Sequence, residues 1–243
     1  MKLNPILDAR FFFATAPLPC PYLEGRLERR VVTELVGRDA AALHDALTHA
    51  GFRRSHAIVY APACTGCDAC VPLRIVARDF RPTRTQKRVG RRNRAFEVRE
   101  QPPIATAEQF DLFVRYQNRR HADGDMANMD YDDFRALIED TPVETAMVEV
   151  RDGDGVLAAA VLADRIEDGL SAVYSFYDPA RETDSLGTFM ILWLVERARA
   201  LRLPYVYLGF WIADCRKMSY KSNFSPVEAR GKDGWAPLRM PSR

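Results

Sequence analysis

Hydrophobic spacing and capping signals along the chain predict several helices. Leu43, Leu47 and Ala50 fall on one side of the segment 39–50, which a glycine ends. A threonine–glutamine capping box opens a second helix, and an aspartate cap and a later proline bracket a third. The segment 186–201 is apolar nearly all round, so we expect it to be packed deep in the protein. The helices predicted in this way cover residues 39–50, 106–121, 131–139 and 186–201.

Runs of branched and aromatic residues between these helices predict strands. Turns rich in aspartate and glycine, at 152–155 and 167–169, join three of the runs, so we expect antiparallel hairpins there. One more short strand follows the apolar helix. The predicted strands cover residues 57–60, 72–76, 144–151, 156–164, 169–177 and 205–208.

The order of these elements indicates the fold class. Two helices, an antiparallel meander, a buried helix and a further strand resemble the N-acetyltransferase-like (GNAT) α+β fold, whose sheet splays to admit an acyl donor. Pro102 and Pro103 favour a boundary before the first of the two helices. We therefore expect a smaller cysteine-containing N-terminal domain over 1–103 and a GNAT-like catalytic domain over 104–243. A fold alone does not fix a function.

Composition narrows the class of protein. The 243 residues are 47% hydrophobic and 28% charged, with a formal net charge of +2, as in a soluble globular protein. No run approaches the ~18 to 20 apolar residues of a membrane span, and the apolar run 11–14 follows charged residues too closely for a signal peptide. The sequence therefore predicts a cytoplasmic protein without a membrane partner.

A basic segment stands out against this small net charge. Eight of the seventeen residues from 78 to 94 are lysine or arginine. We expect a basic helix over 83–93, which would suit contacts with RNA phosphates. The alternative is a solvated helix face. The cations that share one side of this helix, and are our candidates for tRNA contact, are Arg84, Lys87, Arg88, Arg91 and Arg92.

Cysteines form the strongest local motif. Cys64, Cys67 and Cys70 are separated by two residues each, and Cys20 could supply a fourth thiolate after the chain folds back. Four thiolates suit a zinc ion or an iron–sulfur cluster. The alternative is that the cysteines stay reduced and steady a loop.

Several common catalytic signatures are missing from the sequence. It contains no Walker A loop and no Gly-x-Gly-x-x-Gly after a strand. Ser171 lacks the second glycine of a nucleophile elbow, which argues against a serine hydrolase. The segment 181–187 has one glycine and two acidic residues where acetyltransferases of this fold have a glycine-rich pyrophosphate loop. Coenzyme A would be repelled there.

A series of short motifs, in order along most of the chain, resembles the bacterial aminoacyl-tRNA-protein transferases. The N-terminal motifs are CPYL (20–23), GFRRS (51–55), the cysteine cluster with Pro72 and Arg74, and TQKR (85–88). The later motifs are RY (115–116), RH (120–121), SAVYSFY (171–177), SLGT (185–188), YLGFWI (207–212) and MSYK (218–221). The chain is most similar to the branch that attaches leucine, although Thr83 and Thr85 replace serines of that branch.

The resemblance implies an activity. Enzymes of this family transfer leucine, or in other branches arginine, from a charged tRNA to the N-terminal Asp or Glu of a target protein, which marks the target for N-degron (N-end rule) degradation. The implied partners are aminoacyl-tRNA, with leucyl-tRNA favoured, and proteins with an acidic N-terminus. The ester is already activated, so no cofactor is required. Holding the two reactants together can supply ~7 to 11 kcal/mol of the barrier.

Residues in the matched motifs are candidates for the site. An acidic N-terminal residue needs a cation, and Arg74, Arg120 and Lys221 could supply it. His121, next to Arg120, is the candidate proton acceptor, and we group the two as catalytic. The alternatives are structural ion pairs for the cations and a helix cap for His121.

Further candidates would bind the substrates. Ser185 and Gly187 could offer hydroxyl and backbone N–H groups to the tRNA end, and the alternative for Ser185 is a simple N-cap. Aromatic side chains could stack on the terminal adenosine or hold the leucyl group, and we expect two of five to do so, because most aromatics at strand spacing belong to the core. These five are Tyr174, Phe176, Tyr177, Tyr207 and Trp211.

Two other functions remain open from the sequence. One is an acetyl-CoA-dependent N-acetyltransferase, which the fold permits and the missing pyrophosphate loop opposes. The other is a metal-stabilised RNA-binding module, which leaves the second half of the chain unexplained. Binding of coenzyme A would favour the first of these, and label transfer from leucyl-tRNA to a peptide would exclude the second.

Overall fold

The computed structural model describes residues 10–122, 124–215 and 217–239. Its α-helices are α1 (Ala40–His49), α2 (Arg84–Arg92), α3 (Ala107–Arg120), α4 (Tyr131–Glu139) and α5 (Leu186–Ala200). Short 3₁₀ helices are η1 (Ala77–Asp79), η2 (Asp125–Asn128), η3 (Pro179–Asp184) and η4 (Ser219–Asn223).

The strands belong to one large sheet and two smaller ones. The eight-stranded sheet has the order β14 (Gly234–Pro237), β13 (Val227–Gly231), β7 (Val71–Val76), β12 (Tyr205–Trp211), β11 (Gly169–Tyr177), β10 (Leu157–Ile166), β9 (Thr145–Arg151) and β8 (Glu97–Gln101). The smaller sheets pair β1 (Phe13–Ala14), β4 (Arg30–Glu34), β6 (Ile58–Pro62) and β5 (Arg53–Ser55), and β2 (Leu18–Pro19) with β3 (Leu27–Glu28).

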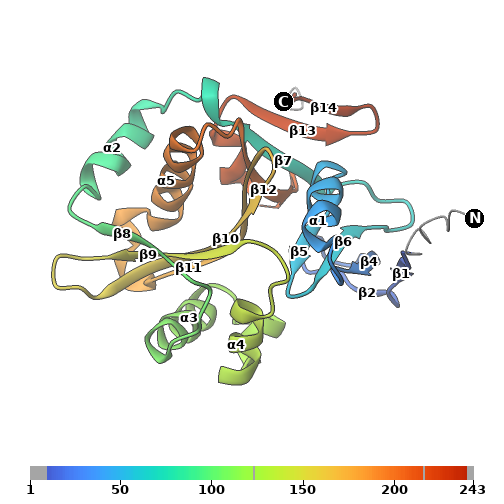
Figure 1. Cartoon of the computed structure of the whole chain (residues 1–243), viewed down its shortest axis with the longest axis horizontal. Coiled ribbons are helices and arrows are strands. Elements are labelled where there is room, and N and C mark those ends of the chain that lie inside the picture. The colour runs from blue at the N-terminus through green and yellow to red at the C-terminus, as the bar shows by residue number, and fades with distance from the viewer. Residues whose placement is uncertain (1–9, 123, 216, 240–243) are drawn as a thin grey trace, which may run out of the picture.

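The large sheet is antiparallel except between β11 and β12. Helices α5 and α2 lie on one face of the sheet and α3 and α4 on the other (Figure 1). The α5 face contains a large apolar cluster around Met190, Leu194 and Val195. The opposite face packs Phe113 and Phe134 against the sheet. The alternation of side chains along each strand thus supplies a core on both faces.

Residues 10–70, which we call the cysteine region, carry the smaller sheets and α1. They lie beside the large sheet at the side opposite α2 (Figure 1). Their own core is small and centres on Leu35, Ala40 and Val59. A buried ion pair between Arg54 of this region and Asp164 of β10 therefore helps to hold the region against the large sheet.

The structure confirms an α+β fold and most of the predicted elements. Helix α4 and strand β11 have the predicted bounds, and the hairpins β9–β10 and β10–β11 are antiparallel as expected. The deep position of α5 is also confirmed, because six of its residues are buried. Strands β1 to β5, β8, β13 and β14 were not predicted from the sequence.

Strand β7 lies between β12 and β13 inside the large sheet, and β8 forms one of the two edges. Both strands precede Pro102 in the sequence, so the large sheet contains strands from both sides of the expected domain boundary. The division at residue 103 stays a prediction, and the structure adds that residues 71–101 pack with the second half of the chain.

Candidate functional site

The large sheet opens between β11 and β12. The two strands pair in parallel at three positions, from Gly169 opposite Tyr205 to Ser171 opposite Tyr207. Beyond these pairs β11 continues to Tyr177 and β12 to Trp211 without further pairing to each other. Along this stretch, some backbone carbonyls of the two strands accept hydrogen bonds from side chains of other elements instead of from the facing strand.

Helix α5 begins beside this opening. Ser185 precedes the helix with φ 55° and ψ 45°, a left-handed conformation that is uncommon for a residue other than glycine. Its side chain makes no capping hydrogen bond, which the N-cap interpretation would require. A Cβ atom added to Gly187 would lie 3.4 Å from the ring of Tyr177. The first turn of α5 therefore adjoins the end of β11.

The end of α3 lies against the same part of β11. Arg120 donates a hydrogen bond of 2.9 Å to the Tyr177 hydroxyl. The Tyr116 ring packs edge-on against Tyr177 with ring centroids 4.9 Å apart, and its hydroxyl lies 3.3 Å from Nε2 of His121. Gln117 donates to the Tyr174 hydroxyl over 2.6 Å. Several predicted site residues thus meet in one cluster.

His121 is the C-cap residue of α3, and its backbone N–H bonds to the Gln117 carbonyl. Burial lowers the pKa of the His121 imidazole, and the positive charges of Lys217 and Arg120 lower it further. The ring is therefore neutral at pH 7 and able to accept a proton. The geometry fits both the capping and the proton-acceptor interpretations.

Lys221 lies in η4 and is 7% exposed. Its Nζ donates a hydrogen bond of 2.6 Å to the Phe210 carbonyl of β12. Burial lowers the pKa of the Lys221 amine to about 7, and the nearby charge of Arg53 adds to this effect. This amine is thus close to the opening and can exist in either protonation state.

Arg53 was not among the predicted site residues, although it belongs to the motif GFRRS. It extends from β5 to the opening, where Nη2 donates a hydrogen bond of 2.8 Å to the Val173 carbonyl of β11. The motif was a sequence signal, but its position beside β11 depends on contacts between residues 120 positions apart.

Arg74 is removed from this cluster and has partners of its own. Its guanidinium pairs with Glu228 at 2.7 Å and donates to the Tyr207 hydroxyl at 3.0 Å. The same group lies over the rings of Tyr205 and Trp235, 3.5 Å and 4.5 Å from their centroids. This is the structural ion pair that the sequence left as an alternative for Arg74.

Three of the aromatic candidates are buried. Phe176 is 0% exposed and packs between Phe113 and Phe134, so it belongs to the core. Tyr207 is buried beside Arg74, and Trp211 is buried on the α5 face with no hydrogen-bond partner for its Nε1 among the described residues. The other two candidates, Tyr174 and Tyr177, are partly exposed next to α3.

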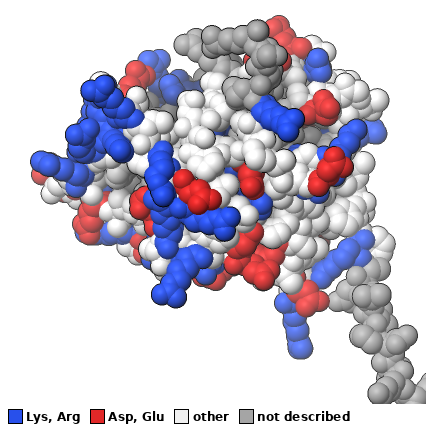
Figure 2. Space-filling model, turned by 90° about the horizontal axis from the view of Figure 1, so that it is seen from above, with Lys and Arg blue, Asp and Glu red and all other residues white. Residues whose placement is uncertain are grey.

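The basic segment forms α2, with a capping box between Thr83 and Gln86. Lys and Arg side chains gather over this helix at the left of the view in Figure 2. Arg92 donates to the Thr183 carbonyl, and Asn93 donates to the Asp184 carbonyl over 2.7 Å. The end of the basic helix is thereby fixed to the segment that precedes α5. The five predicted cations, Arg84, Lys87, Arg88, Arg91 and Arg92, are all exposed.

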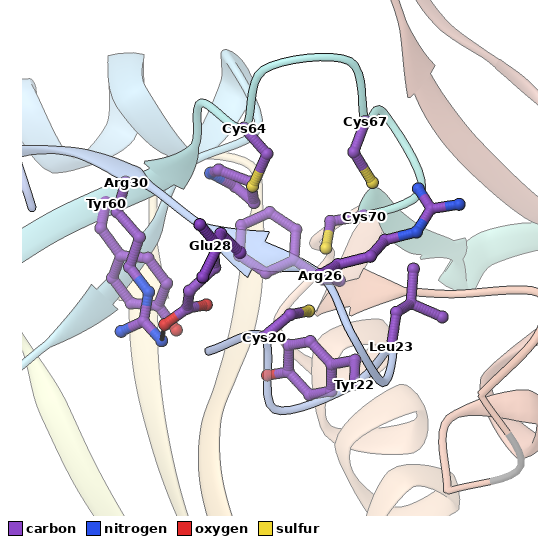
Figure 3. A pocket seen from close by; sticks show the side chains of 13 residues that line it. Cys20, Tyr22, Leu23, Arg26, Glu28, Arg30, Tyr60, Cys64, Cys67 and Cys70 are labelled. Atoms are coloured by element: carbon purple, nitrogen blue, oxygen red, sulfur yellow. Dashed lines mark hydrogen bonds and ion pairs between the residues drawn. The ribbon is translucent and has the colours of Figure 1, made fainter. Parts of the chain in front are cut away.

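The four N-terminal cysteines line one pocket in the cysteine region. Their thiols face the same space between the loop 64–70 and the segment around Tyr22 (Figure 3). Burial raises the pKa of the Cys70 thiol to about 11, and the other three cysteines act in the same direction. Among the described residues, no group of three or more His, Cys, Asp or Glu side chains is arranged to hold a metal ion. The structure therefore gives no support to the expected zinc ion or iron–sulfur cluster.

Family profiles match both halves of the chain. The profile described as "Arginine-tRNA-protein transferase, N terminus" matches residues 18–88, and the corresponding C-terminus profile matches residues 108–230. A protein of Paramagnetospirillum magneticum called "Aspartate/glutamate leucyltransferase" is 60% identical and covers 95% of each chain. A protein of Granulibacter bethesdensis with the same name is 55% identical over 97% of this chain and 88% of its own.

These matches define the protein as an acyltransferase. More particularly, the chain belongs to the arginine-tRNA-protein transferase family and to its aspartate/glutamate leucyltransferase branch.

Solved structures are more distant. L-PGS from Bacillus licheniformis is 12% identical with a TM-score of 0.46, and the match covers 74% of this chain and 52% of that one. The chain thus spans about half the length of that structure. The likeness is too distant to indicate an activity. No helix in the described part of the chain is long and apolar enough to cross a membrane.

Proposed function

We propose that this protein transfers leucine from leucyl-tRNA to the N-terminal Asp or Glu of target proteins. Relatives with that name cover 95% and 97% of the chain at 60% and 55% identity. The structural observation that carries the proposal is the opening between β11 and β12 beside the start of α5. In the GNAT-like interpretation this opening admits the acyl donor, here the aminoacyl end of a tRNA.

The reaction is aminolysis of an ester. The α-amine nitrogen of the target forms a bond to the leucyl carbonyl carbon, and the bond from that carbon to the ribose oxygen breaks. The amine loses a proton, and the ribose oxygen gains one as it leaves as a hydroxyl. An α-amine has a reference pKa of about 7.7 to 8.0, so a useful fraction is neutral at pH 7. Positioning of the two ends therefore provides most of the acceleration.

His121 is the proton acceptor in this proposal. Its lowered pKa keeps the ring neutral at pH 7, and the Tyr116 hydroxyl at 3.3 Å orients it. Arg120, which is exposed beside it, would offer positive charge to the reacting ester. Proton transfer of this kind contributes ~10²- to 10⁴-fold to a rate.

Other groups around the opening bind the donor. Ser185 and the N–H of Gly187 would contact the tRNA end, since the left-handed Ser185 leaves its hydroxyl without a capping bond. Tyr174 and Tyr177, the partly exposed aromatics, would hold the leucyl side chain or the terminal base. Phe176, Tyr207 and Trp211 take no part, because they are buried.

Helix α2 would bind the tRNA backbone. Its cations are exposed, and its end is fixed to Thr183 and Asp184 just before α5. A tRNA held on α2 would therefore reach the opening with its 3′ end. The proposal places the protein in the cytoplasm, where charged tRNA is made, and assigns it a role in marking proteins for degradation.

Label transfer tests this function. Radiolabelled leucyl-tRNA is incubated with peptides that start with Asp, Glu or Ala, and label is measured on the peptide. We expect transfer to the Asp and Glu peptides and little to the Ala peptide. Arginyl-tRNA in the same assay checks the donor. Absence of transfer from leucyl-tRNA, or displacement of tRNA by coenzyme A, would contradict the proposal.

A further inference from the structure

Arg53 occupies the place where β11 and β12 part. The last paired residues are Ser171 and Tyr207, and the Arg53 guanidinium bonds to the Val173 carbonyl, two residues further along β11. This arginine comes from the cysteine region, so a separate part of the chain contributes to the opening. The neighbouring Arg54 anchors the same short strand through a buried ion pair with Asp164. Arg53 is thus held in position rather than free at the surface.

Strand β12 makes room for this guanidinium. Gly209 has φ 69°, and the register between β12 and β7 shifts between Tyr207 and Gly209. A Cβ atom at Gly209 would lie 2.3 Å from Nε of Arg53 and 2.6 Å from its Cδ. No side chain fits there while Arg53 keeps its place. The bulge and the glycine therefore accommodate Arg53 against the strand.

In the part of the chain that the structure describes, no carboxylate forms an ion pair with Arg53, and one of its N–H groups is bonded, to the Val173 carbonyl. Lys221 brings an amine to the same stretch of β12 through its bond to the Phe210 carbonyl. The Arg53 charge lowers the pKa of Lys221 in addition to burial. A bound anion would compensate the Arg53 charge and would favour the protonated form of Lys221 beside it.

We propose that Arg53, with Lys221 beside it, receives the side-chain carboxylate of the N-terminal Asp or Glu and so determines acceptor specificity. This inference rests on the proposed function. An arginine fork suits a carboxylate because it can donate two parallel hydrogen bonds. Arg74 is less suited, since Glu228 already pairs with it. Arg120 is exposed at the end of α3 and donates to Tyr177.

The test compares acceptor peptides that differ in charge alone. Peptides starting with Asp, Asn, Glu and Gln are used with wild-type protein and Arg53→Gln, and kcat/KM is measured for each peptide at saturating leucyl-tRNA. We expect Arg53→Gln to lower kcat/KM for the Asp and Glu peptides by about 10- to 150-fold, the equivalent of removing hydrogen bonds to a charged group. The Asn and Gln peptides should keep their wild-type values. Arg53→Glu should reverse the preference toward a peptide that starts with Lys.

Controls separate this role from a structural one. Arg38→Gln removes an exposed arginine from the cysteine region and should leave every ratio unchanged. If Arg53→Gln fails to fold, Arg53→Lys keeps the charge without the fork and should still lower the Asp-to-Asn ratio.

The outcomes that overturn the proposal are distinct. An unchanged Asp-to-Asn ratio in the variants overturns it. A second series varies leucyl-tRNA at a fixed concentration of the Asp peptide, and a rise confined to the KM of leucyl-tRNA also overturns the proposal, because it would assign Arg53 to a tRNA phosphate. If the wild-type protein transfers leucine to none of the peptides, the proposed function fails, and the inference fails with it.

Discussion

Arg54 and Asp164 form a buried, two-pronged ion pair between the cysteine region and the large sheet. Nε and Nη2 of the arginine each lie 2.7 Å from a carboxylate oxygen, and both side chains are 0% exposed. Thr145 donates to the same carboxylate over 2.7 Å. Since Arg53 is the preceding residue, this pair also positions the guanidinium at the opening.

Removing one partner should destabilise the protein strongly. We expect Arg54→Ala to lower the free energy of unfolding by ~3 to 5 kcal/mol, because it leaves the buried Asp164 carboxylate without its arginine partner. Urea unfolding followed by circular dichroism measures this. As a control, Arg99→Ala breaks an exposed pair with Glu97 and should have a much smaller effect. Equal effects of the two substitutions would contradict the prediction.

The buried Lys221 should make stability depend on pH. Its pKa is about 7 in the folded protein, below the ordinary lysine value of 10.5. Between these values the unfolded chain binds a proton that the folded protein does not, so stability rises with pH, by at most about 1.4 kcal/mol per pH unit. This rise in the free energy of unfolding should be absent in Lys221→Met. Urea unfolding of both proteins at pH 7, 8, 9 and 10 measures it. The same pH dependence in the two proteins would contradict the prediction.

A change at His121 should affect the chemical step. We expect His121→Ala to lower the single-turnover rate by ~10²-fold or more. Lys217 is one of the charges that lower the pKa of His121, so Lys217→Met should raise that pKa and move the acidic limb of the rate to higher pH. Single-turnover rates from pH 5 to 8 measure both effects. A normal rate in His121→Ala would remove this residue from the mechanism.

Substitutions on α2 should weaken tRNA binding without changing acceptor choice. We expect glutamine in place of Arg84, Lys87 or Arg88 to raise the Kd for leucyl-tRNA. The slope of log affinity against log salt should fall by about 0.7 to 0.9 for each phosphate that the variant no longer neutralises. Filter binding at several salt concentrations gives this slope. Arg92 is left unchanged because it also contacts Thr183. If the variants had the same salt dependence as the wild-type protein, these side chains would form a solvated helix face without contact to tRNA.

The cysteine pocket can be tested by alkylation. Cys70 should react most slowly with iodoacetamide at pH 8, because its pKa is about 11 and the thiolate is the reactive form. Mass spectrometry of peptides from a time course measures each cysteine. If all four cysteines were protected until a chelator is added, they would share a bound metal, and the slow reaction of Cys70 would not be due to its pKa.

Local signals in the sequence were enough for many elements. Helix α4 and strand β11 were predicted to the residue, because caps, turns and side-chain alternation lie within the segments themselves. Strand β12 was predicted to end at Leu208 but continues to Trp211. Its extension pairs with β7 across a bulge at Gly209. Pairings of that kind depend on distant residues and leave little trace in a local pattern.

The candidate site likewise combines features that local motifs predict with features that depend on distant residues. The motifs around Arg120, His121 and Tyr177 identified a cluster that the structure brings together, although the roles of these residues stay predictions. The sequence could not show that Arg74 forms an ion pair with Glu228, since 154 residues separate the two. Nor could alternation along β11 show that Phe176 faces the core, because both faces of this sheet are covered.

The place of β7 has a consequence for how the protein is made. This strand pairs with β12 and β13, which leave the ribosome more than a hundred residues later. While translation proceeds, the backbone groups of β7 have no neighbours in the sheet, and the nascent chain cannot complete its first half independently. We therefore expect that β12 and β13 must be made before β7 can take its place in the sheet, so chains that stop before residue 205 should lack the sheet around the proposed site.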